Sequence, residues 1–95
     1  MDNERDRAVF AALGNTTRLR IVELVAEAGE TGALPSALAD AVGVPRNLLG
    51  AHLLVLERAG IVVAERQGRN RICRIEAKSL MRVCRTLERL SGAGI

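Results

Sequence analysis

Aromatic side chains are almost absent from this 95-residue sequence, which has no Trp, no Tyr and a single Phe, Phe10. Aliphatic side chains must therefore fill its core, and recognition of RNA or single strands by base stacking is disfavoured. The sequence also has no apolar run long enough to cross a membrane and no signal peptide. We therefore expect a single cytoplasmic domain over residues 1–95, without a membrane partner.

Histidine and cysteine are also scarce: His52 is the only histidine, and Cys73 and Cys84 are the only cysteines. Two thiols in a reducing compartment are not expected to form a structural disulfide. The sequence offers no phosphate loop, no nucleophile–base pair and no paired carboxylates beside the histidine. We therefore predict that the protein is not an enzyme and carries no cofactor and no metal.

The charges are unevenly distributed along the chain. Residues 1–40 carry seven acidic and four basic side chains, whereas residues 41–95 carry ten basic and four acidic ones. Nine of those ten basic residues are Arg. A basic half of this kind favours a polyanionic partner such as nucleic acid over an ordinary solvated surface.

Residues 35–60 have the pattern of two short helices joined by a tight turn. Pro35 suits the first turn of a helix, and Gly43 provides the left-handed residue that ends it. A second helical pattern starts at Pro45 and stops before Gly60, with Leu49, Leu53 and Leu56 on one stripe. This pattern is typical of a helix-turn-helix, in which the second helix enters the major groove of DNA.

Helical patterns also lie on both sides of this region. Residues 1–13 and 17–28 predict two helices, with Asn15 or Thr16 capping the second. Residues 78–91 predict the last helix, and residues 91–95 resemble a loose tail. The apolar stripe of the last helix consists of Leu80, Cys84, Leu87 and Ser91, beside Met81, Val83 and Leu90.

Residues 61–76 predict a β-hairpin with its turn at residues 68–70. Its arginines are Arg66, Arg69, Arg71 and Arg74, and Asn70 lies in the turn. Beside a helix-turn-helix, such a hairpin is a wing whose side chains would reach phosphates or the minor groove. The alternative is a solvent-exposed hairpin. The predicted fold class is thus mainly α with a small β-hairpin, in the order α-α-α-α-β-β-α: a winged helix-turn-helix.

Four motifs in this order resemble the ArsR/SmtB family of bacterial winged-helix repressors, over nearly the whole chain. Residues 12–21, ALGNTTRLRI, resemble the family's ALGDPTRLRI, and residues 38–44, LADAVGV, resemble its LAEALGL. Residues 52–62, HLLVLERAGIV, resemble HLKVLREAGLV, and RQGR at 66–69 followed by RI at 74–75 resembles the wing's REGR…YRL. The resemblance implies a homodimer built on the first and last helices. It would bind a palindromic operator in double-stranded DNA and be released by an inducer.

The second helix of the helix-turn-helix departs from the family pattern. Leu48, Gly50 and Ala51 stand where the family usually has hydroxyl, polar or aromatic residues, and Leu54 stands where Lys is common. Binding would then depend mainly on the wing arginines, with strong salt dependence and modest sequence specificity. The alternative is that Gly50-Ala51 marks a weakened or lost DNA-binding surface.

Two polar residues at the start of this helix are the main candidates for base contacts. Arg46 could contact guanine and Asn47 adenine through paired hydrogen bonds, each contributing about 1–3 kcal/mol of discrimination. Gly50 would allow close approach to the groove, and Ala51 could touch a thymine methyl group. We interpret His52 as a packing residue or a phosphate contact.

The sensor sites of the family are missing from this sequence. Leu34 and Ser36 occupy the positions of the Cys-x-Cys pair on the third helix, and residues 89–94 lack the Cys-Cys pair that binds arsenite past the last helix. One histidine cannot supply the zinc or nickel site. Three alternatives therefore stay open for the inducer: a thiol-reactive species, a small organic molecule in the dimer interface, or no inducer at all.

The two cysteines are the remaining candidates for a thiol sensor. Cys73 has Arg71 and Arg74 beside it, and cations of this kind lower a thiol pKa. Cys84 lies on the apolar stripe of the last helix, and we expect it to be a small buried hydrophobic residue. The alternative for Cys84 is a disulfide or a shared soft ligand with its twin across a dimer axis.

Two functions remain open. The first is a DNA-binding transcriptional repressor, which the wing arginines favour. The second is a winged-helix module for protein–protein interaction with weakened DNA binding, which Gly50, Ala51 and Leu54 favour.

Overall fold

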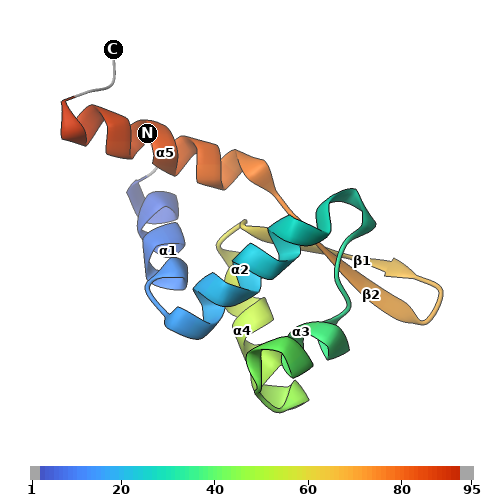
Figure 1. The fold of residues 1–95 in the computed structure, drawn as a ribbon. Coiled ribbons are helices and arrows are strands. Elements are labelled where there is room, and N and C mark those ends of the chain that lie inside the picture. Colours follow the sequence, from blue (N-terminus) through green and yellow to red (C-terminus); the bar gives the residue numbers. More distant parts are fainter. Residues whose placement is uncertain (1–2, 93–95) are drawn as a thin grey trace.

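A computed structural model describes residues 3–92 of the protein, and within this range its helices and single β-hairpin follow the predicted order (Figure 1). The elements are α1 (Asn3–Leu13), α2 (Thr16–Ala28), the 3-10 helix η1 (Gly29–Thr31), α3 (Pro35–Val42), α4 (Arg46–Arg58), β1 (Val62–Gln67), β2 (Asn70–Ile75) and α5 (Ala77–Ser91). The predicted fold class, mainly α with a β-hairpin, is confirmed. Of the helices in residues 3–92, none is both long and apolar enough to cross a membrane.

The helix ends follow local chemistry. Asn15 caps α2, since its side-chain oxygen accepts a hydrogen bond from the backbone N–H of Arg18 at 3.0 Å. Pro35 is the first residue of α3, where a missing N–H leaves no partner unsatisfied. Gly43 ends α3 with φ 72°, in the left-handed region that a side chain would strain. The sequence predicted the roles of Pro35 and Gly43, and it left Asn15 and Thr16 as the two candidates for the cap of α2.

Several boundaries differ from the prediction by one or two residues. Pro45 is the N-cap residue and precedes α4, which starts at Arg46 and ends at Arg58. Asn70 is the first residue of β2 and pairs with Gln67, so the hairpin loop is shorter than the predicted three-residue turn. Ser91 is the last residue of α5 and not part of a tail. The predicted start of the first helix at residues 1–2 and the tail at 93–95 lie outside the described residues.

The hydrophobic core lies where α1, α2, α3, α4 and the base of the hairpin meet. Its largest fully buried side chains are Ile21, Leu49, Leu56, Ile61, Val9, Val25 and Cys73. Aliphatic residues fill this core, as the lack of aromatics predicted, and Phe10 stays 40% exposed. The predicted stripe of α4, formed by Leu49, Leu53 and Leu56, is buried in it.

The buried face of α5 matches the predicted apolar face only in part, since Leu80 is half-buried against the core. Val83 and Thr86 are buried, whereas Cys84 and Leu87 are exposed. The prediction of a buried Cys84 is therefore wrong for the single chain. The reason is that α5 packs mainly against α1, and its C-terminal end extends past that helix (Figure 1).

A buried carboxylate joins α5 to α1. Asp6 accepts a hydrogen bond from Nε of Arg82 at 2.7 Å and one from the hydroxyl of Thr86 at 3.3 Å. The hydrogen bond from the Arg82 guanidinium holds the pKa of Asp6 below its usual value. Asp6 and Arg82 are 76 residues apart, so no local sequence pattern predicts this pair.

Candidate nucleic-acid interface

The solvent-facing side of α4 carries the residues that the sequence assigned to DNA. Because Leu49, Leu53 and Leu56 turn into the core, the opposite side of the helix is open. Its exposed residues are Arg46, Asn47, Leu48, Gly50, Ala51, Leu54, Val55 and Arg58. A Cβ added at Gly50 would meet no atom within 4 Å, so the space beside it is open as well.

His52 lies on the flank of α4 and is half-buried. Its Nδ1 is 3.3 Å from a guanidinium nitrogen of Arg18, whose Nε donates a hydrogen bond to the carbonyl of Ala12 at 2.7 Å. Arg18 therefore connects the end of α1, the start of α2 and the middle of α4. Sequence reasoning missed Arg18, because its partners are far away in the chain. This contact supports the packing interpretation of His52.

The wing places its arginines in a fixed register. Arg66 on β1 pairs with Arg71 on β2, and Gln67 pairs with Asn70. Gly68 and Arg69 form the loop between them, with Gly68 at φ 61°. Figure 1 shows the hairpin projecting away from the helices, so Arg69 lies at its far end.

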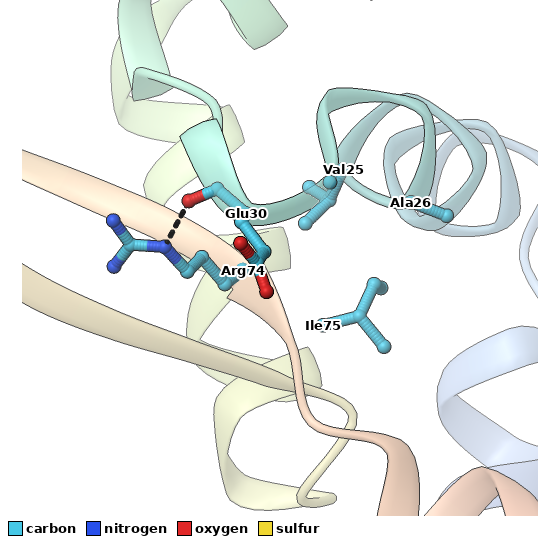
Figure 2. Close-up of a pocket in the computed structure, with 6 residues that line it drawn as sticks. Val25, Ala26, Glu30, Arg74 and Ile75 are labelled. Carbon is cyan, nitrogen blue, oxygen red and sulfur yellow. Dashed lines mark hydrogen bonds between the residues drawn. The ribbon is translucent and has the colours of Figure 1, made fainter.

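Two of the four wing arginines bind protein groups. Arg71 donates a hydrogen bond to Oε1 of Glu57 in the last turn of α4 at 2.9 Å. Arg74 donates from Nε to the backbone carbonyl of Glu30 at 2.7 Å (Figure 2). Its Nη1 also lies 3.4 Å from a carboxylate oxygen of Glu65. The sequence placed all four on the DNA-binding hairpin, whereas Arg74 anchors the wing to η1.

Four other guanidinium groups near α4 and the wing are unpaired. Within residues 3–92, the side chains of Arg46, Arg58, Arg66 and Arg69 make no hydrogen bond or ion pair. Arg58 was not among the predicted site residues, although it follows Leu54 on the same side of α4. Unpaired, exposed cations are free to neutralise phosphates.

The base of the wing is tied to the linker before α3. Ala33 and Cys73 exchange backbone hydrogen bonds of 2.9 and 2.8 Å. Gly32, at φ 79°, lies so close to the hairpin that an added Cβ would collide with a methyl group of Ile72. The wing therefore has a fixed position relative to the helix-turn-helix.

The two thiols lie in opposite environments. Cys73 is 1% exposed, and burial raises the pKa of its thiol despite the nearby Arg71. Burial therefore outweighs the neighbouring cations that made Cys73 a candidate thiol sensor, because it disfavours the thiolate. Cys84 is exposed in the single chain. In the part of the chain that the structure covers, residues 3–92, no three His, Cys, Asp or Glu side chains gather to hold a metal ion.

A hollow of about 370 Å³ lies behind the wing, between α2, η1 and the end of β2. Its lining residues are Val25, Ala26, Gly29, Glu30, Arg74 and Ile75, and Figure 2 shows the carboxylate of Glu30 among them. The hydrogen bond from Arg74 to Glu30 joins two of these lining residues. It is separate from the exposed side of α4.

A helix-turn-helix followed by an attached β-hairpin is the architecture of a winged helix-turn-helix protein. In this chain the exposed surfaces of α4 and of the hairpin both carry arginines. The family described as "Helix-turn-helix domain" matches residues 13–65, more than half of the chain. The chain therefore belongs to this family. An uncharacterized HTH-type transcriptional regulator of Methanocaldococcus jannaschii is 35% identical over 65 residues, which cover 68% of this chain and 71% of the relative.

Solved structures identify the branch of the family. A crystal structure of an ArsR family transcriptional regulator has a TM-score of 0.86 at 25% identity, covering 97% of this chain and 92% of the other. An ArsR-like transcriptional regulator from Rhodococcus sp. RHA1 has a TM-score of 0.77 at 32% identity, covering 94% and 81%. A homodimeric winged helix-turn-helix DNA-binding domain from Mycobacterium bovis has a TM-score of 0.75 at 27% identity, covering 94% and 80%. The chain is the DNA-binding domain of an ArsR-family transcriptional regulator, which is not an enzyme.

Proposed function

We propose that this protein is a homodimeric repressor that binds a palindromic operator through α4 and the wing. The observation that carries the proposal is a set of four guanidinium groups that have no partner among residues 3–92, those of Arg46 and Arg58 on α4 and of Arg66 and Arg69 on the wing. Such cations release counterions when they neutralise phosphates, which supplies affinity for duplex DNA. In this proposal residues 1–95 act as one domain for both DNA binding and dimerisation.

The exposed apolar residues of the first and last helices support the dimer. Phe10 on α1 is 40% exposed, and Met81, Leu87 and Leu90 on α5 are 55%, 50% and 71% exposed. An apolar surface of this kind on a small domain is typical of a protein interface. A twofold dimer would place two α4 helices in successive major grooves, and the operator would then be a palindrome.

The proposed contacts follow the positions of the side chains. Arg46 and Asn47, at the N-terminal end of α4, would read guanine and adenine in the major groove. Arg66, Arg69 and Asn70 would contact phosphates or the minor groove. An inducer, a small molecule or a thiol-reactive species acting on the exposed Cys84, would release the operator.

The test is the affinity for duplex DNA across a salt series, measured by fluorescence anisotropy. Each phosphate contact contributes a slope of about −0.9 in log K against log salt, so Arg66→Ala/Arg69→Ala should flatten the slope by about 1.8 per subunit, or about 3.6 for the dimer. Arg20→Ala, which removes one positive charge per subunit, controls for a general charge effect, because its guanidinium on α2, 52% exposed, pairs with Glu23 and Glu27 instead. A folded dimer that binds no duplex at low salt would overturn the proposal.

The second candidate, a module for protein–protein interaction, is favoured by one observation on the same helix. Leu48, Leu54 and Val55 of α4 are 44%, 46% and 40% exposed, which is unusual for a surface that binds only phosphates. Loss of DNA binding at low salt, with the dimer intact, would be the result that this candidate predicts.

A further inference from the structure

The centre of the exposed side of α4 is apolar. Leu48, Ala51, Leu54 and Val55 are all exposed there, and we call them the apolar strip. Asn47 precedes the strip and Arg58 follows it on the same side of the helix, at the helical spacing 47, 51, 54 and 58. Polar groups therefore lie at both ends of the strip.

Only one base presents an apolar group in the major groove. Thymine carries a methyl group on C5, and an aliphatic side chain can bury it favourably. The major-groove edge of a G·C pair offers only hydrogen-bond donors and acceptors to a protein. Leucine side chains packed against such an edge would remove it from water without replacing its hydrogen bonds, which is unfavourable.

We infer that α4 recognises thymine methyl groups, so that the middle of each operator half-site is A·T-rich. This inference rests on the proposed function, because it requires α4 to lie in the major groove. Leu48, Ala51 and Leu54 contact the methyl groups, and Asn47 hydrogen-bonds a base at the edge of the strip. The lack of a side chain at Gly50 lets the helix approach the bases closely.

Charge complementarity favours DNA as the occupant of this surface. The unpaired guanidinium groups of Arg46 and Arg58 lie on the same helix as the strip, and those of Arg66 and Arg69 lie on the wing. The wing is joined to α4 by the hydrogen bond from Arg71 to Glu57. An apolar strip beside cations fits a polyanion that displays methyl groups. Thymine-rich duplex DNA is such a polyanion, and its methyl groups lie in the major groove.

The test begins with selection of bound duplexes from a randomised DNA library at low salt. Each thymine of the selected sequence is then replaced by deoxyuridine, which removes the methyl group and keeps every hydrogen-bonding group. We expect an A·T-rich centre in each half-site, and an affinity about fourfold weaker for each covered methyl group that is removed.

Variants of the strip connect this loss to particular side chains. Leu48→Ala and Leu54→Ala remove exposed atoms, so both variants should fold, and thermal unfolding checks this. Each should weaken binding to the selected duplex and reduce the penalty for deoxyuridine. Leu19→Ala is the matched control, because Leu19 is 47% exposed on α2 and lies outside the strip. It should change neither quantity.

The possible failures have different meanings. Equal affinity for thymine and deoxyuridine duplexes, or a selected sequence with G·C pairs at the centre, would overturn methyl recognition and leave the proposed function intact. A deoxyuridine penalty that persists unchanged in both leucine variants would assign the effect to DNA shape and overturn the role of the strip. Failure to bind any duplex at low salt would overturn the proposed function and this inference together.

Discussion

Arg71 on β2 donates a hydrogen bond to Glu57 on α4, with 2.9 Å between Nη2 and Oε1. The side chain of Arg71 is 56% exposed and that of Glu57 is 25% exposed, so the pair lies at the surface between the wing and the proposed recognition helix. The contact positions the wing. It also occupies a cation that could otherwise bind a phosphate, so in the proposed complex Glu57 and DNA would compete for the same guanidinium.

Replacing Glu57 by glutamine should therefore strengthen DNA binding. The amide is neutral, so Arg71 becomes available to a phosphate, and the slope of log K against log salt should steepen by about 0.9 per subunit, or about 1.8 for the dimer. The free energy of unfolding should change by less than about 1 kcal/mol, because exposed ion pairs contribute little. Anisotropy titrations across a salt series and thermal unfolding measure the two quantities.

Glu23→Gln controls for the change in net charge. Glu23 lies on α2, where its carboxylate is 3.6 Å from Arg20 and away from the wing. A steeper slope in both variants would indicate a general charge effect. Weaker binding by Glu57→Gln alone would mean that the pair serves to position the wing and that competition with DNA is unimportant.

Gly50→Ala should change stability and DNA binding in opposite directions. Gly50 lies inside α4, and an alanine Cβ would meet no atom within 4 Å, so the substitution should stabilise the fold by about 0.5–1 kcal/mol. If α4 approaches the bases closely at this position, the added methyl group should reduce operator affinity. Chemical denaturation and anisotropy test this pair of effects, and a variant that is more stable with unchanged affinity would argue against close approach at Gly50.

Local chemistry explains which parts of the fold could be predicted from the sequence. The start of α3 at Pro35 and its end at Gly43 each depend on a few adjacent residues and were predicted, and the cap of α2 was predicted to be Asn15 or Thr16. The contacts of Arg18 and Arg74 could not be predicted, because their partners His52 and Glu30 are brought close only by folding. Most of the predicted DNA contacts would be made by exposed side chains. Helical periodicity predicts the side of the helix on which such a side chain lies, but it does not predict which molecule the side chain binds.

Asp6 predicts a pH dependence of stability. The hydrogen bond from Arg82 lowers its folded-state pKa, so the stabilisation is present above the unfolded-state pKa of about 3.9 and disappears as the pH falls through the lower folded value. Asp6→Asn should therefore have a lower melting temperature than the native protein at pH 7, and the two should converge in strong acid. Glu4→Gln, an exposed carboxylate on the same helix, is the control and should show no such convergence.

The burial of Cys84 was predicted wrongly for a reason that concerns the partner of α5. Helical spacing placed Cys84 and Leu87 on one apolar stripe, but α1 covers Val83 and Thr86 instead. An apolar stripe in the sequence does not predict which helix packs against it. Met81, Leu87 and Leu90 stay exposed on α5, and they belong to the surface that we propose for the second subunit.

The two thiols should therefore react at very different rates. In the folded protein Cys84 should react first with a thiol reagent, whereas Cys73 should react only as the wing opens, because it is 1% exposed and burial raises its pKa. Cys84→Ser should abolish the fast phase and leave the slow one. A fast phase that survives Cys84→Ser would contradict the burial of Cys73.

The raised pKa of Cys73 also predicts how stability depends on pH. The thiol of Cys73 loses its proton at a lower pH in the unfolded chain than in the folded one, so the free energy of unfolding should fall as the pH rises above about 8.5. Cys73→Ala should weaken this alkaline loss.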